Sequence, residues 1–127
     1  MMSLRFRSLC RASMILASLA GACAFCSNAA ASGHTCGAQR LSTITGYVTA
    51  QGISCAAARE VFVAVERSPL PNDVATTPYF RFSPSYSVST PAGRFSCRRE
   101  PHGLAGSEHT IFCVRGPIRV RWYTVHE

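Results

Sequence analysis

Seven cysteines in a chain of only 127 residues constrain its fold more than any other feature of the sequence. Three of them lie within the N-terminal residues 1–31. The other four follow in the rest of the chain, at Cys36, Cys55, Cys97 and Cys113. An even number of cysteines in a small exported domain predicts two disulfides, for which three pairings are possible. Because so short a chain buries only a modest core, these cross-links would contribute much of its stability.

Residues 1–31 have the pattern of a secretory signal peptide. The start MMSLRFRSLCR carries three arginines and no acid, and the apolar run ASMILASLAGACAF follows it. Ala29 and Ala31 then occupy the small-residue positions that precede a cleavage site. The apolar run is shorter than the roughly 20 residues that span a bilayer. We therefore expect cleavage after Ala31, export, and no transmembrane segment in the mature chain.

Lipid anchoring through Cys23 is the alternative to a cleaved signal peptide. The sequence LAGA precedes this cysteine, but Leu19 lies one position too far upstream for a good lipobox. In either case the rest of the chain, residues 32–127, is long enough for a single small domain.

The basic character of the predicted mature chain comes from arginine alone, since the sequence contains no lysine. Three of the 13 basic residues belong to the signal segment, and the ten that remain stand against six acids, which gives a net charge of +4. Such a charge favours anionic partners, including wall polymers, nucleic acids and membrane surfaces. The arginines are scattered rather than consecutive, as on an ordinary solvated surface.

The stretch around Cys55 predicts a strand followed by a helix. Residues 41–50 alternate in character and are rich in Thr, Val and Ile, which indicates a strand after a polar lead-in. Ser54 is a good N-cap, and apolar residues then recur at helical spacing. Pro69 ends this pattern because the residue before a proline disfavours helical dihedral angles. We expect a helix over residues 54–67.

Residues 68–93 contain five of the seven prolines and predict a loop. Its aromatic residues argue against a disordered linker, and a short extended piece is expected around residues 79–82. These aromatic residues are Tyr79, Phe80, Phe82 and Tyr86.

The C-terminal third predicts three antiparallel strands, over residues 94–100, 109–115 and 117–125, with one apolar and one arginine-rich face. The fold class expected is therefore α+β, with one amphipathic helix packed on an antiparallel sheet of about four strands. Two disulfides would cross-link this single domain, which spans residues 32–127 and includes the proline-rich loop 68–93.

Cys55 at the start of a helix could be a reactive thiol, because a helix N-terminus favours the thiolate. Thiol catalysis also needs a histidine base. The four histidines stand in no recognisable motif, and the predicted compartment is oxidising. We therefore expect Cys55 to form a disulfide. The histidines are His34, His102, His109 and His126.

The preferred pairing is Cys55–Cys97 together with Cys36–Cys113. The first bond would join the helix to the sheet, and the second would hold the N-terminal lead-in. Cys97–Cys113 is the main alternative, since their strands are expected to pair with the two cysteines nearly opposite each other.

Three short motifs, ISCAAAREV, GRFSCRR and FCVRGPIRVRW, together resemble a group of small exported actinobacterial proteins. The shared outline is a Ser-Cys-x-x-Ala helix start, an aromatic-x-Cys strand and a Cys-x-x-Gly hairpin. The resemblance covers residues 46–67 and 94–122 and leaves the proline-rich middle unmatched. It implies export and this fold, and it implies no reaction.

Two surfaces are candidates for binding. The first is a basic face with an interleaved tyrosine, which suits an anionic polymer or a nucleic acid. The second is the aromatic part of the proline-rich loop, where a rigid segment lowers the entropy cost of binding a protein. The basic face comprises Arg98, Arg115, Arg119, Arg121 and Tyr123, and the loop comprises Tyr79, Phe80, Phe82 and Tyr86.

Catalysis and cofactor binding have less support. The chain has no GxSxG, Walker or HExxH motif and no paired-carboxylate spacing. His102, Glu108 and His109, with or without His34, match no standard metal-ligand spacing. The sequence thus favours a secreted, non-catalytic, cofactor-free protein that binds an anionic cell-wall polymer or an extracellular protein. Inhibition of an exported protease or lysozyme through the loop is the alternative.

Overall fold

The computed structural model describes residues 33–103 and 107–126. The predicted signal peptide, residues 1–31, and its cleavage site lie outside the described residues. Within the described ranges no helix is both long and apolar enough to cross a membrane.

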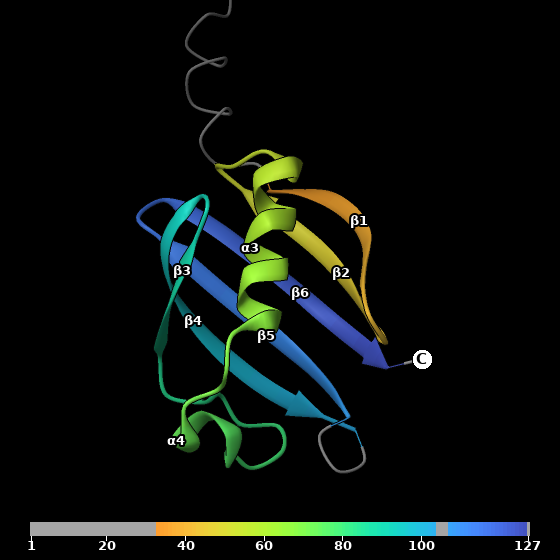
Figure 1. The fold of residues 1–127 in the computed structure, drawn as a ribbon, viewed down its shortest axis with the longest axis vertical. Coiled ribbons are helices and arrows are strands. Elements are labelled where there is room, and N and C mark those ends of the chain that lie inside the picture. Colours follow the sequence, from red (N-terminus) through yellow and green to blue (C-terminus); the bar gives the residue numbers. More distant parts are fainter. Residues whose placement is uncertain (1–32, 104–106, 127) are drawn as a thin grey trace, which may run out of the picture. The chain divides into compact units, whose positions relative to one another are not determined.

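Six strands form one antiparallel sheet in the order β1-β2-β6-β5-β4-β3 (Figure 1). The strands are β1 (Gly33–Leu41), β2 (Ile44–Gln51), β3 (Tyr86–Thr90), β4 (Gly93–His102), β5 (Glu108–Arg115) and β6 (Ile118–His126). Two helices lie between β2 and β3 in the chain: α3 (Cys55–Arg67) and the single turn α4 (Asn72–Ala75). In Figure 1, α3 lies across one face of the sheet.

The prediction of one helix on about four strands was therefore wrong, because the described structure is mostly sheet. The polar lead-in forms the edge strand β1, which pairs with β2 from Gly33↔Gln51 to Leu41↔Ile44. Most β1 side chains are exposed, and its pairing relies on backbone hydrogen bonds that any sequence can make. An edge strand of this kind has no apolar alternation to reveal it. The second additional strand, β3, comes from the end of the proline-rich segment.

The predicted helix is confirmed. The Ser54 hydroxyl accepts a hydrogen bond from the amide of Ala57 at 3.2 Å, which caps the first turn of α3. The buried side of α3 packs against the sheet, where the Phe62 ring meets Trp122 edge-on at 5.5 Å. Gly46 on β2 permits this approach, since a Cβ atom there would collide with the Phe62 ring. Burying these large side chains supplies most of the hydrophobic stabilisation.

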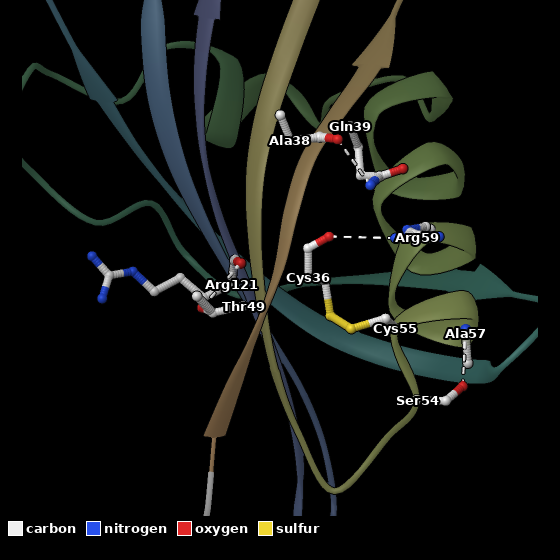
Figure 2. Close-up of a disulfide and its surroundings, with 9 residues drawn as sticks. All are labelled: Cys36, Ala38, Gln39, Thr49, Ser54, Cys55, Ala57, Arg59 and Arg121. Carbon is white, nitrogen blue, oxygen red and sulfur yellow. Dashed lines mark hydrogen bonds between the residues drawn. A yellow bond between two sulfur atoms is a disulfide. The ribbon is translucent and has the colours of Figure 1, made fainter.

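The disulfides join Cys36 to Cys55 and Cys97 to Cys113, with Cα atoms 5.3 Å and 4.1 Å apart. The preferred pairing of Cys55 with Cys97 and of Cys36 with Cys113 was therefore wrong, and the alternative Cys97–Cys113 is the one present. Cys97 and Cys113 are directly opposite on β4 and β5. Cys36 reaches Cys55 because β1 runs beside the start of α3, as Figure 2 shows. The missed strand β1 is thus the cause of the wrong pairing.

A buried polar cluster joins the C-terminal end of α3 to the sheet. One carboxylate oxygen of Glu66 accepts hydrogen bonds from Trp122 Nε1 at 2.7 Å and His109 Nε2 at 2.8 Å. The other ring nitrogen of His109, Nδ1, lies 3.4 Å from the Arg99 guanidinium. Because a guanidinium can only donate, Nδ1 accepts and Nε2 carries the proton given to Glu66. His109 thus bridges a carboxylate to a guanidinium.

Candidate binding face

The sheet has a second face, opposite α3, that no described helix covers. Along β6, Val120, Trp122 and Thr124 point towards α3 and are buried, so the residues between them point the other way. Figure 2 shows the side chains of Arg121 and Thr49 on the side of the sheet away from α3 and the Cys36–Cys55 disulfide. We call this surface the open face.

Cross-strand pairing arranges the side chains of the open face in rows. Residues directly opposite each other in a sheet share a face, so each row follows from the register. One row, here called the arginine row, consists of Thr49, Arg121, Phe112 and Arg98. The row beside it consists of Gln51, Arg119, Val114 and Ser96, and the row on its other side of Tyr47, Tyr123, Thr110 and Glu100.

The arginines of the open face are not neutralised by neighbouring acids. Within the described residues Arg98, Arg119 and Arg121 form no ion pair. The Arg121 guanidinium lies over the Phe112 ring, 5.1 Å from its centre, and Arg98 Nε donates to the hydroxyl of Ser85 at 3.1 Å. These contacts hold the two guanidinium groups in place while leaving donors free for an anion.

A shallow hollow of about 310 Å³ lies on this face. That volume is at the lower end of the range for ligand sites. Arginine and aliphatic side chains form its walls, so it offers both charge and apolar contact. Its lining includes Thr49, Gln51, Phe112, Val114, Arg119 and Arg121.

Aromatic rings continue the open face towards the proline-rich segment. The rings of Tyr123 and His102 lie 5.9 Å apart, and that of Phe80 lies 5.6 Å beyond His102. The hydroxyl of Tyr123 donates to the Glu108 carboxylate, and this hydrogen bond raises the pKa of Tyr123. The second carboxylate at this end of the face, that of Glu100, lies 3.4 Å from His102 Nε2. Both carboxylates thus have partners, and neither lines the hollow that contains Arg119 and Arg121.

The aromatic part of the proline-rich segment adjoins the same face. The Phe82 ring packs on Phe112 at 5.4 Å. The amide of Phe80 donates to the carbonyl of Pro101 at 3.0 Å, and that of Ser83 to the carbonyl of Arg99 at 2.8 Å. These bonds fasten the segment along β4 as a series of turns, so the extended piece expected at residues 79–82 is absent. The two binding surfaces expected from the sequence are therefore neighbours.

Two residues expected at these surfaces lie elsewhere. Arg115 falls on the α3 side of the sheet, opposite Ile118, and donates to the carbonyl of Ala92 at 2.9 Å. Tyr86 is a buried β3 residue opposite Cys97, with only 8% of its surface exposed. Arg98, Arg119, Arg121 and Tyr123 share the open face, while Tyr79, Phe80 and Phe82 are exposed beside it.

Sequence reasoning missed Phe112, Tyr47 and Thr49 as members of the open face. Phe112 stands between Ile111 and Cys113 in an unbroken apolar run, where nothing in the sequence tells which side a residue faces. Tyr47 and Thr49 could have been found, since the alternation in β2 places them together on the side opposite Val48.

The groups considered as metal ligands are not brought together. His109 is buried on the α3 side against Glu66, whereas His102 hydrogen-bonds the Thr110 hydroxyl at 2.9 Å on the open face. Glu108 accepts from Tyr123. Among the described residues, the three metal-ligating side chains that do gather are His34, Cys36 and Cys55.

Replacing Tyr86 with phenylalanine tests the assignment of this residue to the core. Burial, reinforced by the charge of Glu66, raises the pKa of Tyr86 from 10.0 to about 12. The phenol therefore ionises near pH 10 when unfolded and near pH 12 when folded, so stability is intact below pH 10 and falls as the pH rises to 12. Between pH 10 and pH 12 the free energy of unfolding of Tyr86→Phe should therefore fall by about 3 kcal/mol less than that of the unaltered protein.

At neutral pH the same variant should change the free energy of unfolding little, since within the described residues the Tyr86 hydroxyl has no hydrogen-bond partner. Urea unfolding of both proteins at pH 7, 10 and 12 measures the difference. An identical alkaline loss in the two proteins would show that the Tyr86 phenol is solvated.

No family model, curated protein sequence or solved structure matches this chain.

Proposed function

We propose that the protein is an exported, non-catalytic binding protein that holds an anionic extracellular or cell-wall polymer on its open face. The observation that carries this proposal is that Arg119 and Arg121 lie side by side at the hollow and have no acidic partner among residues 33–103 and 107–126. The two disulfides are compatible with an extracellular protein. The signal peptide and the resemblance to exported actinobacterial proteins stay predictions.

The chemistry of the open face suits a chain of rings that carry carboxylate, phosphate or sulfate groups. Guanidinium groups bind such anions with two parallel hydrogen bonds. Tyr47, which is 53% exposed and lies opposite Tyr123 on this face, presents a flat apolar surface on which a sugar ring can lie. Rows of side chains across three or four strands match an extended polymer better than a compact ligand, because they repeat at the strand spacing of about 4.8 Å.

Each exposed arginine contributes modestly, since solvent and salt screen its charge. The affinity should therefore be the sum of several contacts and should fall steeply as the salt concentration rises.

Removing the two arginines at the hollow tests this proposal. The variant Arg119→Gln/Arg121→Gln should bind heparin, used as the probe, at least tenfold more weakly than the unaltered protein. The slope of log affinity against log salt concentration should become shallower by about two, one for each lost ionic contact. Affinity measured by calorimetry at four salt concentrations gives both quantities.

A matched control removes the same charge from the opposite side of the molecule. Arg59 and Arg67 both lie on the outer side of α3, where they line a separate groove. Arg59→Gln/Arg67→Gln should leave heparin affinity within about twofold, since screening limits the effect of distant charges. Equal weakening by both variants would mean that net charge alone attracts the polymer, and the proposal would fail.

Inhibition of an exported hydrolase is a second candidate, favoured by one observation. Phe80 is 72% exposed and has a φ of 55°, a conformation that costs a non-glycine residue energy. A strained, exposed aromatic residue on a disulfide-linked scaffold suits insertion into an enzyme cleft.

This second candidate predicts stoichiometric inhibition of a serine protease or lysozyme that is insensitive to salt. Phe80→Ala should weaken such inhibition at least tenfold, whereas Tyr79→Ala, a neighbouring exposed aromatic residue, should have a smaller effect. Absence of inhibition across subtilisin-like, trypsin-like and lysozyme enzymes would remove this candidate.

A further inference from the structure

The two disulfides have different surroundings. Cys97 and Cys113 are enclosed in the core, with 0% and 1% of their surfaces exposed. Cys55 is partly exposed as the first residue of α3, and its partner Cys36, although only 7% exposed, lies on the edge strand β1. A thiol reductant in solution can therefore reach Cys36–Cys55 far more readily than Cys97–Cys113.

The strand and the helix that carry the two cysteines are also joined beside the disulfide. Cys55 begins α3, whose first turn contains no acid. Arg59, one turn further along, donates to the carbonyl of Cys36 at 3.5 Å (Figure 2). This contact helps to keep Cys36 and Cys55 close to each other after the disulfide opens.

A third ligand stands beside the two sulfur atoms. His34 pairs with the buried Ala50 on β2 and so lies on the α3 side of the sheet, and a β-bulge at Cys36 separates the two residues on β1. One ring nitrogen of His34 and the two sulfur atoms all lie within 4.8 Å of one another. Tetrahedral zinc sites hold sulfur and nitrogen ligands at about 2.3 Å and 2.0 Å from the metal, so ligand atoms lie about 3.5–3.8 Å apart. Small side-chain rotations suffice to reach that geometry.

We propose that reduction of Cys36–Cys55 creates a binding site for a borderline-soft divalent cation, best fitted by Zn²⁺, with His34, Cys36 and Cys55 as ligands. A dithiol reductant supplies two electrons and two protons, becomes a disulfide itself, and leaves Cys36 and Cys55 as thiols. Zinc binding then releases both thiol protons to solvent, and water takes the fourth position. This site is independent of the polymer-binding face, which lies on the other side of the sheet.

The fold should tolerate this reduction. Cys97–Cys113 stays closed in the core, and β1 keeps its backbone pairing to β2. The core contact between Phe62 and Trp122 involves neither of the reduced cysteines. The site can therefore assemble on a folded chain.

Selective reduction followed by titration with Zn²⁺ alone tests the proposal. After treatment with a mild dithiol, differential alkylation and peptide mapping should find Cys36 and Cys55 modified and Cys97–Cys113 intact. The reduced protein should then bind one more equivalent of zinc than the Cys36→Ser/Cys55→Ser variant does. The dissociation constant for this equivalent should be micromolar or lower. That variant subtracts any contribution of the three N-terminal cysteines, which all variants share.

The role of His34 has its own control. His34→Ala should weaken this zinc binding at least tenfold, whereas His126→Ala, which removes a histidine at the end of β6, should not change it. Substitution with Co²⁺ should show the visible absorption of a tetrahedral thiolate site. The proposal is overturned if both disulfides open together, if reduction abolishes the near-ultraviolet signal of Trp122, or if the double serine variant binds as much zinc.

Discussion

Replacing Glu66 with alanine is expected to lower the free energy of unfolding by about 2–6 kcal/mol, because two buried donors lose their acceptor at a cost of about 1–3 kcal/mol each. The Glu66 and His109 side chains are only 7% and 6% exposed. Removing the carboxylate leaves Trp122 Nε1 and His109 Nε2 without their acceptor in the core. The His109 ring, which contacts the Arg99 guanidinium, then loses the carboxylate that orients it. Urea unfolding followed by Trp122 fluorescence measures the loss.

The conservative variant Glu66→Gln separates hydrogen bonding from charge. Its amide oxygen can still accept from Trp122 and His109, so the loss should be smaller than that for alanine. As a control, Glu60→Ala removes a solvent-exposed acid from the same helix and should change stability by no more than about 0.5 kcal/mol. If Glu66→Ala proved as mild as Glu60→Ala, the polar cluster would not be holding α3 to the sheet.

Loss of the Cys97–Cys113 disulfide is the second large effect expected. The bond closes a loop with a sequence separation of 16 residues, worth about 3 kcal/mol in the chain-entropy account. Both cysteines are fully buried in the core, so Cys97→Ala/Cys113→Ala also leaves a small cavity. We expect a total loss of about 3–5 kcal/mol, measured as the shift in the urea midpoint.

The other disulfide provides the matched comparison. Cys36–Cys55 has a separation of 19 residues, so loop closure alone predicts nearly the same stabilisation for both bonds. Cys55 is partly exposed, and Cys36 belongs to an edge strand that can fray without opening the core. Cys36→Ala/Cys55→Ala should therefore cost less than the core pair. A larger loss at Cys36–Cys55 would contradict both this ranking and the tolerance to reduction proposed above.

The elements that the sequence predicted correctly have a strong local pattern. The helix α3 has its Ser54 cap and a repeating apolar side, and β6 alternates between buried and exposed residues along its length. The local sequence pattern does not predict strands that are stabilised mainly by pairing with neighbouring strands. β1 is mostly exposed and shows no alternation of apolar and polar residues. β3 does alternate, with Tyr86 and Val88 buried, but it is short and follows a proline-rich stretch that predicted a loop.

The candidate site was predictable only in part. The alternation of side chains along β6 is enough by itself to place Arg119, Arg121 and Tyr123 on one face. Arg115 was assigned to the wrong face, although the sequence contained the information needed to place it. A two-residue turn at residues 116–117 puts Arg115 opposite Ile118, on the apolar side of the sheet. The hollow and the neighbouring aromatic loop depend on the order of strands in the sheet, which local patterns do not determine.

Mapping the bound polymer by nuclear magnetic resonance tests the central claim most directly. A heparin-derived oligosaccharide would be titrated into the isotope-labelled protein while its amide and side-chain signals are followed. If the polymer binds the open face, saturable shifts are expected there and none along the outer side of α3. The residues expected to shift are Thr49, Phe112, Arg119 and Arg121. Shifts concentrated at Arg59 and Arg67, or spread evenly over all arginines, would contradict the central claim.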